Sequence, residues 1–189
     1  MFLKLIFFCW DIFILFWVIN MFSNKRTIKR GTLGNRLGYT VLYFVAFWLL
    51  FESIFRHRLH STEFAVLSHF IALNVFSLVL TVFGLVLAIW ARVVLGKNWS
   101  GHVTFKENHE LIMQGPYAFV RHPIYTGLLL MFLGTALAIG TLGGLIGVPI
   151  LFLSFWIKCQ QEEAFMIEHF GDQYRDYMKR VRAIIPFVF

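Results

Sequence analysis

Charged residues are scarce in this chain. Only 14% of its 189 residues are Asp, Glu, Lys or Arg, whereas 59% are hydrophobic and the mean hydropathy is +0.72. A soluble domain usually has about a quarter of charged residues and about half of apolar ones. The shortage of charge therefore excludes an ordinary soluble domain and indicates an integral membrane protein.

Cysteine is scarce too, and the common nucleotide-binding and catalytic motifs are missing. The two cysteines, Cys9 and Cys159, lie far apart in apolar stretches and form no CxxC pair, so we expect buried, inert thiols. The histidines His102, His109 and His122 match no compact zinc pattern, and we expect no metal site. The sequence has no Walker loop, no GxGxxG fingerprint and no GxSxG elbow.

What the sequence does have is a series of long apolar segments. They predict helices near residues 2–22, 39–55, 64–95, 124–140 and 142–169. Since a span needs roughly 20 residues, we predict an all-α integral membrane protein with about five transmembrane helices in one domain, 1–189. The first segment is too long for a signal peptide, and no small-residue cleavage site follows it. The short, glycine-rich link between helices four and five predicts a close antiparallel hairpin.

The net charge of +7 follows the topology and does not indicate a nucleic-acid partner. Basic residues gather in the loop 23–38, in the region 92–121 and from Lys158 to the tail, and five spans put all three groups on one side. The positive-inside rule then sets the N-terminus outside and the C-terminus inside. The loop 96–123 and the tail would share the cytoplasmic face of the plasma (inner) membrane.

The segment GPYAFVRHPIY, residues 115–125, is a poor transmembrane helix. Pro116 and Pro123 each remove a backbone donor and disfavour helix in the residue before them. Arg121 and His122 are costly at membrane depth unless they have partners or water. Taken alone, they are best explained as an arginine on lipid phosphate and a satisfied interfacial histidine.

The stretch KCQQEEAFMIEHF contains Lys158, Glu162 and Glu163, and the first two lie four residues apart on one helix face. Alone, this pair is best explained as an interfacial ion pair. Together with the broken segment it can enclose a zwitterionic ligand, because cations hold a carboxylate and glutamate holds an ammonium. Tyr117 and Tyr125 can flank an apolar or cationic group of that ligand.

Two stretches, HELIMQGPYAFVRHPIYTG and QQEEAFMIEHFGDQYRDYMKRV, resemble the isoprenylcysteine carboxyl methyltransferase family. That family belongs to a wider group of membrane methyltransferases that includes phospholipid methyltransferases. The resemblance covers residues 95–187, and LGKNWS resembles the upstream segment of prokaryotic members. It implies S-adenosylmethionine as methyl donor, a cytoplasmic cofactor pocket formed by the 96–123 loop and the C-terminal segment, and a lipophilic acceptor reached from the membrane. Residues 95–189 would then hold the methyltransferase motifs, and the three helices of residues 1–94 would line the acceptor's access.

The resemblance also implies the site residues. The cofactor-binding positions are His109, Glu110, Leu111, Ile112, Tyr117, His122, Pro123, Ile124, Tyr125 and Glu162. Lys158 takes the place of the substrate-side arginine of the eukaryotic enzymes, keeping the charge but losing the bidentate fork. We expect Lys158 and Arg121 to be catalytic, with Arg121 and His122 suited to the donor's carboxylate and Glu162 to its amino group.

Three functions stay open at this stage. The leading hypothesis is methyl transfer to a lipophilic acceptor, including the carboxylate of an isoprenylcysteine-like substrate, which needs no strong base because it is already ionised. The second is a phospholipid amine N-methyltransferase, whose nucleophile must first lose a proton to a base such as His109 or Glu163. The third is a non-catalytic membrane scaffold whose polar segments only contact membrane lipids.

Overall fold

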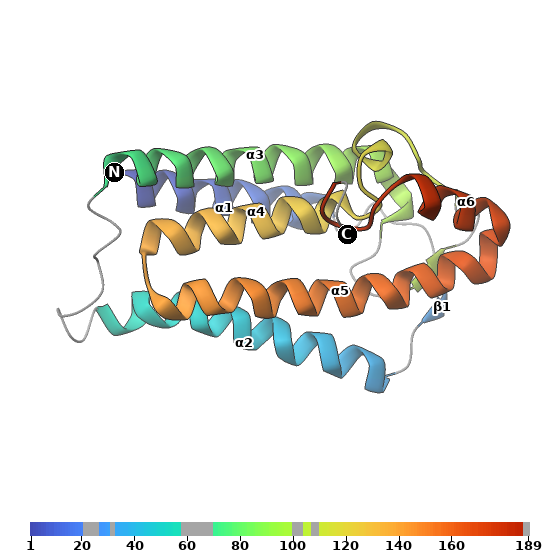
Figure 1. Cartoon of the computed structure of the whole chain (residues 1–189), viewed down its shortest axis with the longest axis horizontal. Helices are drawn as coiled ribbons and strands as arrows, with labels where there is room; N and C mark the ends of the chain where they lie inside the picture. The colour runs from blue at the N-terminus through green and yellow to red at the C-terminus, as the bar shows by residue number, and fades with distance from the viewer. Residues whose placement is uncertain (21–26, 31–32, 58–69, 100–103, 107–109, 187–189) are drawn as a thin grey trace.

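The computed structural model of the chain is almost entirely helical (Figure 1). It describes residues 1–20, 27–30, 33–57, 70–99, 104–106 and 110–186. The long helices are α1 (Phe2–Asn20), α2 (Leu33–His57), α3 (Ile71–Leu95), α4 (Pro123–Ile139) and α5 (Leu142–Phe170), followed by the short α6 (Asp172–Arg180). Two short strands, β1 (Thr27–Arg30) and β2 (Thr104–Lys106), pair antiparallel, and the 3-10 turns are η1 (Gly96–Asn98) and η2 (Gly115–Ala118).

The five predicted helices correspond to α1 through α5, with one clear difference at α2. This helix begins at Leu33, inside the basic loop that the sequence predicted for residues 23–38. The predicted start at residue 39 followed hydropathy. A helix can extend beyond the apolar layer through polar residues, which a hydropathy pattern does not mark as helical. The predicted start of the third helix, residues 64–69, lies outside the described residues.

Three of the described helices are long and apolar enough to cross a membrane: α1, α3 together with η1, and α5. The apolar parts of α2 (Leu37–Glu52) and α4 are shorter than the roughly 20 residues of a typical span. The all-helical membrane architecture is thus confirmed, whereas the count of five spans stays a prediction. Large side chains such as Phe8, Leu15, Phe83 and Val93 are more than half exposed, as expected of a surface that faces lipid.

Glycines let α4 pack against α3 at very short distance. A methyl group added at Gly127 would lie 2.5 Å from the carbonyl oxygen of Gly84, and one added at Gly84 would lie 2.4 Å from that of Gly127. Further along, Gly134 faces Thr81 and the backbone of Ser77 just as closely. Small residues at such positions allow two backbones to approach in the membrane, and this contact sets the position of the start of α4.

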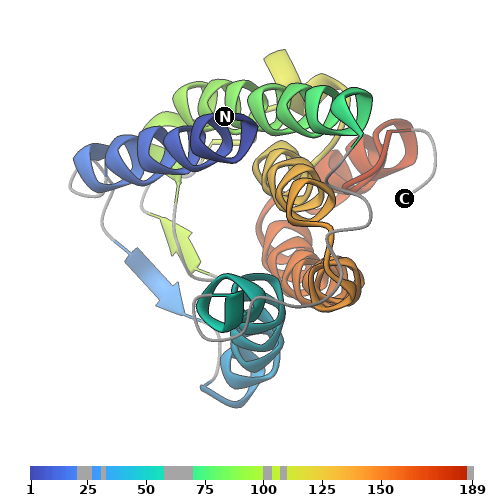
Figure 2. The ribbon, with the colours of Figure 1, turned by 90° about the vertical axis from the view of Figure 1, so that its left-hand side faces the viewer.

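The α4–α5 hairpin has the expected antiparallel course (Figure 1), with Gly140 in a left-handed conformation (φ 72°) and Thr141 capping α5. Its glycines, however, also serve a different contact. Gly143 and Gly147 face the α2 backbone at Leu49 and Ala46, so they bring α5 close to α2. An end-on view shows the result: α1 lies beside α3, α4 lies between α3 and α5, and α2 flanks α5 (Figure 2).

A core cluster joins α2, α4, α5 and the C-terminal segment after α6. Its buried members include Leu50, Phe132, Leu151, Phe155 and Ile184. Because the C-terminal segment contributes to this core, it is held against the start of α4 and the second half of α5. The candidate site lies at that end of the bundle.

Candidate functional site

The segment between α3 and α4 is broken in the structure, as its prolines and glycine predict. Gly115 has φ 61° and faces Trp90 and Val94, which favours glycine at this position. Pro116 lies near the start of η2, and Pro123 is buried at the start of α4, where the missing N–H costs no hydrogen bond. Arg121 and His122 therefore lie in non-helical backbone immediately before α4.

His122 lies between the two carboxylates of α5. Its Nε2 is 3.0 Å from Oε1 of Glu163, and its Nδ1 is 3.5 Å from Oε2 of Glu162. An ionised carboxylate only accepts hydrogen bonds, so both ring nitrogens act as donors when the imidazole is protonated. Burial alone would lower the pKa of His122, but its contacts with Cys159, Glu162 and Glu163 outweigh burial and raise the pKa well above its ordinary value.

Arg121 binds Glu163 from the other side. Its Nε donates to Oε1 of Glu163 at 2.8 Å, and its Nη2 lies 2.7 Å from the same oxygen. Its Nη1 donates to the carbonyl oxygens of Val181 and Met178. Each nitrogen of the guanidinium thus has an acceptor within the protein, and the two side chains, 9% and 4% exposed, form a buried ion pair.

Glu162 is more accessible than Glu163, with 23% of its side chain exposed against 4%. The hydroxyl of Tyr125 donates to its Oε1 at 2.7 Å, and Nζ of Lys158 lies 4.0 Å from the same oxygen. The ring of Tyr125 stacks between His122 and Phe155. Glu162 is therefore the carboxylate of the pair with surface left for a ligand.

Lys158 lies between two aromatic rings. Its Nζ is 5.2 Å from the ring centre of Tyr125 and 5.7 Å from that of Tyr39, which α2 contributes. Ring faces attract a cation at such distances. Only 14% of its side chain is exposed, so the ammonium is held at one position beside Glu162.

An apolar wall adjoins these charges. Tyr117 and Ile124 are buried in a cluster with Ala91, and Ile112 and Tyr125 pack against it. The hydroxyl of Tyr117 donates to the carbonyl oxygen of Ala91 in α3. Burial raises the pKa of this phenol, so it stays neutral and contributes an aromatic surface.

The C-terminal segment closes the site as a strap, which we define as residues 181–184. Arg182 pairs with Val120 as a parallel β-bridge, and the main-chain nitrogens of Arg121 and His122 donate to the carbonyl oxygens of Arg182 and Ala183 at 2.8 and 2.9 Å. The hydroxyl of Thr126 donates to the carbonyl oxygen of Ile184 at 2.6 Å. The strap thus fixes the backbone that carries Arg121 and His122.

The structure brings most of the predicted site residues to one end of the bundle. The polar group holds Arg121, His122, Tyr125, Lys158 and Glu162, and the adjoining wall holds Ile112, Tyr117 and Ile124. Pro123 is buried at the start of α4. Glu110 is exposed and Leu111 is half-buried in the coil before η2. His109 lies outside the described residues.

Two residues of the cluster were not predicted to bind the donor or the acceptor, although Glu163 was considered as a base for an amine acceptor. Glu163 is the carboxylate that binds both Arg121 and His122, and the second glutamate of the EE pair was its only sequence signal. Tyr39 comes from α2, where nothing in the sequence distinguishes it from the other aromatic residues. Among the described residues no group of three or more His, Cys, Asp or Glu side chains could hold a metal ion.

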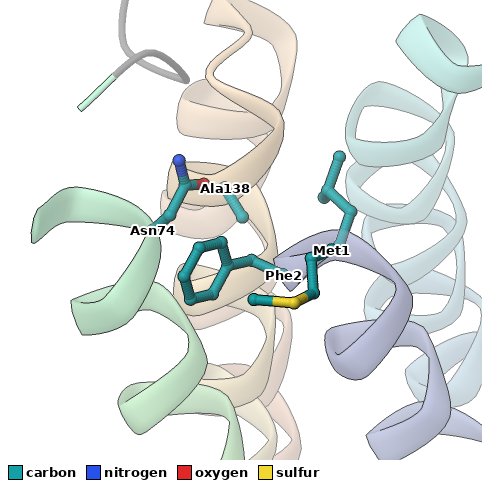
Figure 3. Close-up of a pocket in the computed structure, with 5 residues that line it drawn as sticks. Met1, Phe2, Asn74 and Ala138 are labelled. Atoms are coloured by element: carbon teal, nitrogen blue, oxygen red, sulfur yellow. The ribbon is translucent and has the colours of Figure 1, made fainter. Parts of the chain in front are cut away.

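A cavity of about 190 Å³ lies at the other end of the bundle (Figure 3). It is lined by Met1, Phe2, Leu3, Asn74 and Ala138. Ala138 lies at the end of α4, whereas His122 directly precedes its start, so this cavity is separate from the ionic cluster. The predicted pocket between the 96–123 loop and the C-terminal segment stays a prediction, because parts of that loop lie outside the described residues.

Fold and site together define a class: a helical membrane protein with a buried ionic cluster, closed by its C-terminal segment, at one end of the apolar bundle. The family model described as phospholipid methyltransferase matches residues 72–173, more than half of the chain. The chain therefore belongs to the phospholipid methyltransferase family.

Individual relatives are similar over different lengths. Protein-S-isoprenylcysteine O-methyltransferase of Schizosaccharomyces pombe is 37% identical over 101 residues, which cover 52% of this chain and 43% of the relative. The Homo sapiens protein of the same name is 32% identical over 180 residues, 91% of this chain and 60% of the relative. This chain thus spans about half of the length of the curated relatives that it matches.

A solved structure is similar as well. The eukaryotic intramembrane Ras methyltransferase ICMT (isoprenylcysteine carboxyl methyltransferase) superposes with a TM-score of 0.58 at 26% identity, over 80% of this chain and 53% of the other. These similarities confirm the resemblance to the isoprenylcysteine carboxyl methyltransferase family that the sequence motifs indicated.

Proposed function

We propose that this protein is a membrane-embedded, S-adenosylmethionine-dependent methyltransferase that acts on the carboxylate of a lipophilic, isoprenylcysteine-like acceptor. The observation that carries the proposal is His122 held between Glu162 and Glu163, with Tyr125 and Lys158 in contact with the more accessible carboxylate, Glu162. The cluster lies inside the region that matches the methyltransferase family. The names of the relatives support the carboxylate as acceptor.

The residues of the site fit the proposed donor. S-adenosylmethionine carries a carboxylate, an amino group and a sulfonium, and the cluster offers a partner for each. Nδ1 of His122 suits the carboxylate, because its 3.5 Å contact with Glu162 is longer than the 3.0 Å contact of Nε2 with Glu163 and can be exchanged for a ligand oxygen. The accessible oxygen surface of Glu162 suits the amino group. The rings of Tyr117 and Tyr125 suit the sulfonium, since cations bind to aromatic faces.

On the acceptor side, Lys158 is the cation that we assign to the substrate carboxylate. The rings of Tyr39 and Tyr125 and the carboxylate of Glu162 hold its ammonium in place before a substrate binds. A group held in advance loses little conformational freedom on binding. As a single ammonium it binds one carboxylate as a point charge and without the paired geometry of an arginine.

When bound, the donor would supply an electrophilic methyl group. The acceptor's carboxylate oxygen would form the new O–C bond as the C–S bond breaks, leaving a methyl ester and a neutral thioether. No proton has to move, so the chain does not need a free base. Its contribution is alignment by His122, Glu162 and Lys158, and exclusion of water by the apolar wall around Tyr117 and Ile124. Glu163, whose Oε1 is bound by Arg121 and His122, is poorly placed to accept a proton.

The family match itself supports a second candidate, a phospholipid amine N-methyltransferase. An amine acceptor has to release a proton, and the protonated state of His122 and the engaged state of Glu163 disfavour this route. The product distinguishes the two functions, because a methyl ester is cleaved by mild alkali and an N-methyl group is not.

The test is methyl transfer from S-adenosylmethionine with a labelled methyl group, using detergent-purified protein and a small S-prenylated cysteine with a free carboxylate. We expect label in the lipid-extractable product, released as methanol by mild alkali, and none with Glu162→Gln. Label that resists alkali, after incubation with phospholipid extracts, would establish the amine function instead. No transfer by well-folded protein to either acceptor would favour the scaffold.

We also propose that the site faces the cytoplasm of the plasma (inner) membrane, with the N-terminus outside. The basic residues of β1 and α6 support this orientation, since both elements lie at the end of the bundle that holds the site (Figure 1). The apolar part of a lipophilic acceptor would then lie in the membrane. Its carboxylate would reach Lys158 at the cytoplasmic side. Membrane lipids are the other expected partners.

A further inference from the structure

We propose that Arg121 is a positioning residue: it clamps the strap, residues 181–184, and the end of α6 onto Glu163, and thereby fixes His122 in the donor site. This inference rests on the proposed function, because it assigns Arg121 a role within that site. It differs from the sequence-based expectation that Arg121 contacts the donor's carboxylate directly.

The first argument is that the guanidinium is already occupied. Its Nε and Nη2 lie 2.8 and 2.7 Å from one oxygen of Glu163, and Nη1 donates to the carbonyl oxygens of Met178 and Val181. A ligand carboxylate would have to displace these acceptors. With 9% of its side chain exposed, Arg121 offers little surface from which to bind one.

The second argument is what those carbonyl oxygens belong to. Met178 lies in the last turn of α6, and Val181 follows the helix directly as its C-cap. The last carbonyl groups of a helix lack partners within the helix and carry partial negative charge. Arg121 therefore caps the C-terminus of α6 with a cation and sets where the strap begins.

The third argument is that His122 is held by the same two groups that Arg121 holds. Its main-chain nitrogen donates to the carbonyl oxygen of Ala183 in the strap, and its Nε2 contacts Glu163. If Arg121 no longer holds the strap and Glu163, the two contacts that fix the backbone and the ring of His122 are both weakened. A displaced ring costs donor affinity even though Arg121 itself does not touch the donor.

Replacing Arg121 by lysine distinguishes a positioning role from a direct charge contact with a ligand. Arg121→Lys keeps the positive charge, but one ammonium cannot reach Glu163 and two carbonyl groups in different directions at once. A direct contact with a ligand carboxylate would tolerate lysine far better. Thr126 supplies an independent probe, since its hydroxyl holds the strap at Ile184 and carries no charge.

The experiment compares Arg121→Lys, Arg121→Gln and Thr126→Val with the full-length wild type in detergent. Amide hydrogen exchange of residues 181–184 reports the strap, and steady-state kinetics report the KM for S-adenosylmethionine and kcat. The matched control is Arg175→Gln, which removes an exposed i,i+3 pair with Asp172 on α6. Its strap exchange and kinetics should equal those of the wild type.

We expect faster strap exchange and a donor KM raised about tenfold or more in both Arg121 variants, with kcat less affected. Thr126→Val should shift both quantities in the same direction by less. The double variant Arg121→Gln, Thr126→Val should show a smaller effect than the product of the single effects, because a released strap cannot be released twice.

Restoration of the wild-type KM by lysine would overturn the proposal in favour of a direct charge contact, and so would unchanged strap exchange in the Arg121 variants. If those variants fail to fold, Thr126→Val decides, since unaltered exchange or KM there contradicts the coupling. The absence of methyl transfer by the wild type would refute the proposed function, whereas strap exchange would still report whether the clamp exists.

Discussion

The pKa of His122 is raised because two carboxylates face its two ring nitrogens. Neutral imidazole can donate only one hydrogen bond, and Glu162 and Glu163 together require two. Burial opposes this charge, but the contacts outweigh burial and raise the pKa of His122. Of the two nitrogens, Nδ1 has the longer contact, 3.5 Å to Glu162, and is the one that we propose for a ligand's carboxylate. The energetic contribution of the charged ring depends on pH in a predictable direction.

A group whose folded pKa is raised stabilises the protein fully below its unfolded pKa, which is about 6.5 for histidine. That contribution is lost as the pH rises through the folded value. We therefore expect the difference in thermal unfolding temperature between wild type and His122→Gln to be large near pH 6 and to shrink towards alkaline pH. Scans of detergent-purified protein between about pH 6 and about pH 10 measure this, and a difference that grows with pH would contradict it.

At the scale of elements, the contact between α3 and α4 positions the site. Gly84 and Gly127 bring the two backbones together. The same two helices supply two residues of the apolar wall: Ala91 of α3, whose carbonyl oxygen accepts the hydrogen bond of Tyr117, and Ile124 of α4. A side chain between the helices would force them apart. Because α4 begins directly after His122, such a shift would be transmitted to the cluster.

We expect Gly127→Leu to destabilise the protein by at least about 2 kcal/mol and to weaken donor binding, because a Cβ at this position already overlaps the Gly84 carbonyl group. Gly38→Ala is the matched control: nothing lies within 4 Å of the added methyl group, and alanine is the better helix former. Thermal unfolding in detergent measures both, and equal behaviour of the two variants would argue against the close helix contact.

The sequence predicted the helices and the motif residues, but not how they are joined. The prolines around Arg121 predicted the break before α4, and the spacing of Lys158 and Glu162 predicted their common face. The pairing of Arg121 with Glu163 joins residues 42 positions apart on different elements, which local periodicity does not encode. The strap uses main-chain groups, so its side chains carry no signal of it. The early start of α2 was missed because hydropathy marks apolar residues and not helix ends.

For the whole molecule, the proposed orientation predicts which ends are reachable from which side. The native cysteines are buried, so we expect labelling by a maleimide to come from the introduced thiol. Lys179→Cys on α6 should react with a membrane-impermeant maleimide only after the cytoplasmic side is opened, and Leu142→Cys at the α4–α5 turn should react in intact cells. Both replaced side chains are exposed. The reverse labelling pattern would show that the topology is inverted. Labelling of both thiols in intact cells would contradict a cytoplasmic site.

The central claim is that the ionic cluster binds the methyl donor, and calorimetric titration with S-adenosylhomocysteine tests it most directly. This product keeps the carboxylate and the amino group of the donor. We predict a micromolar dissociation constant for the wild type, weakened by roughly 1.5–3 kcal/mol in Glu162→Gln, and unchanged in Asp176→Asn on the exposed face of α6. Absence of binding by well-folded protein, or equal affinity of wild type and Glu162→Gln, would contradict the account.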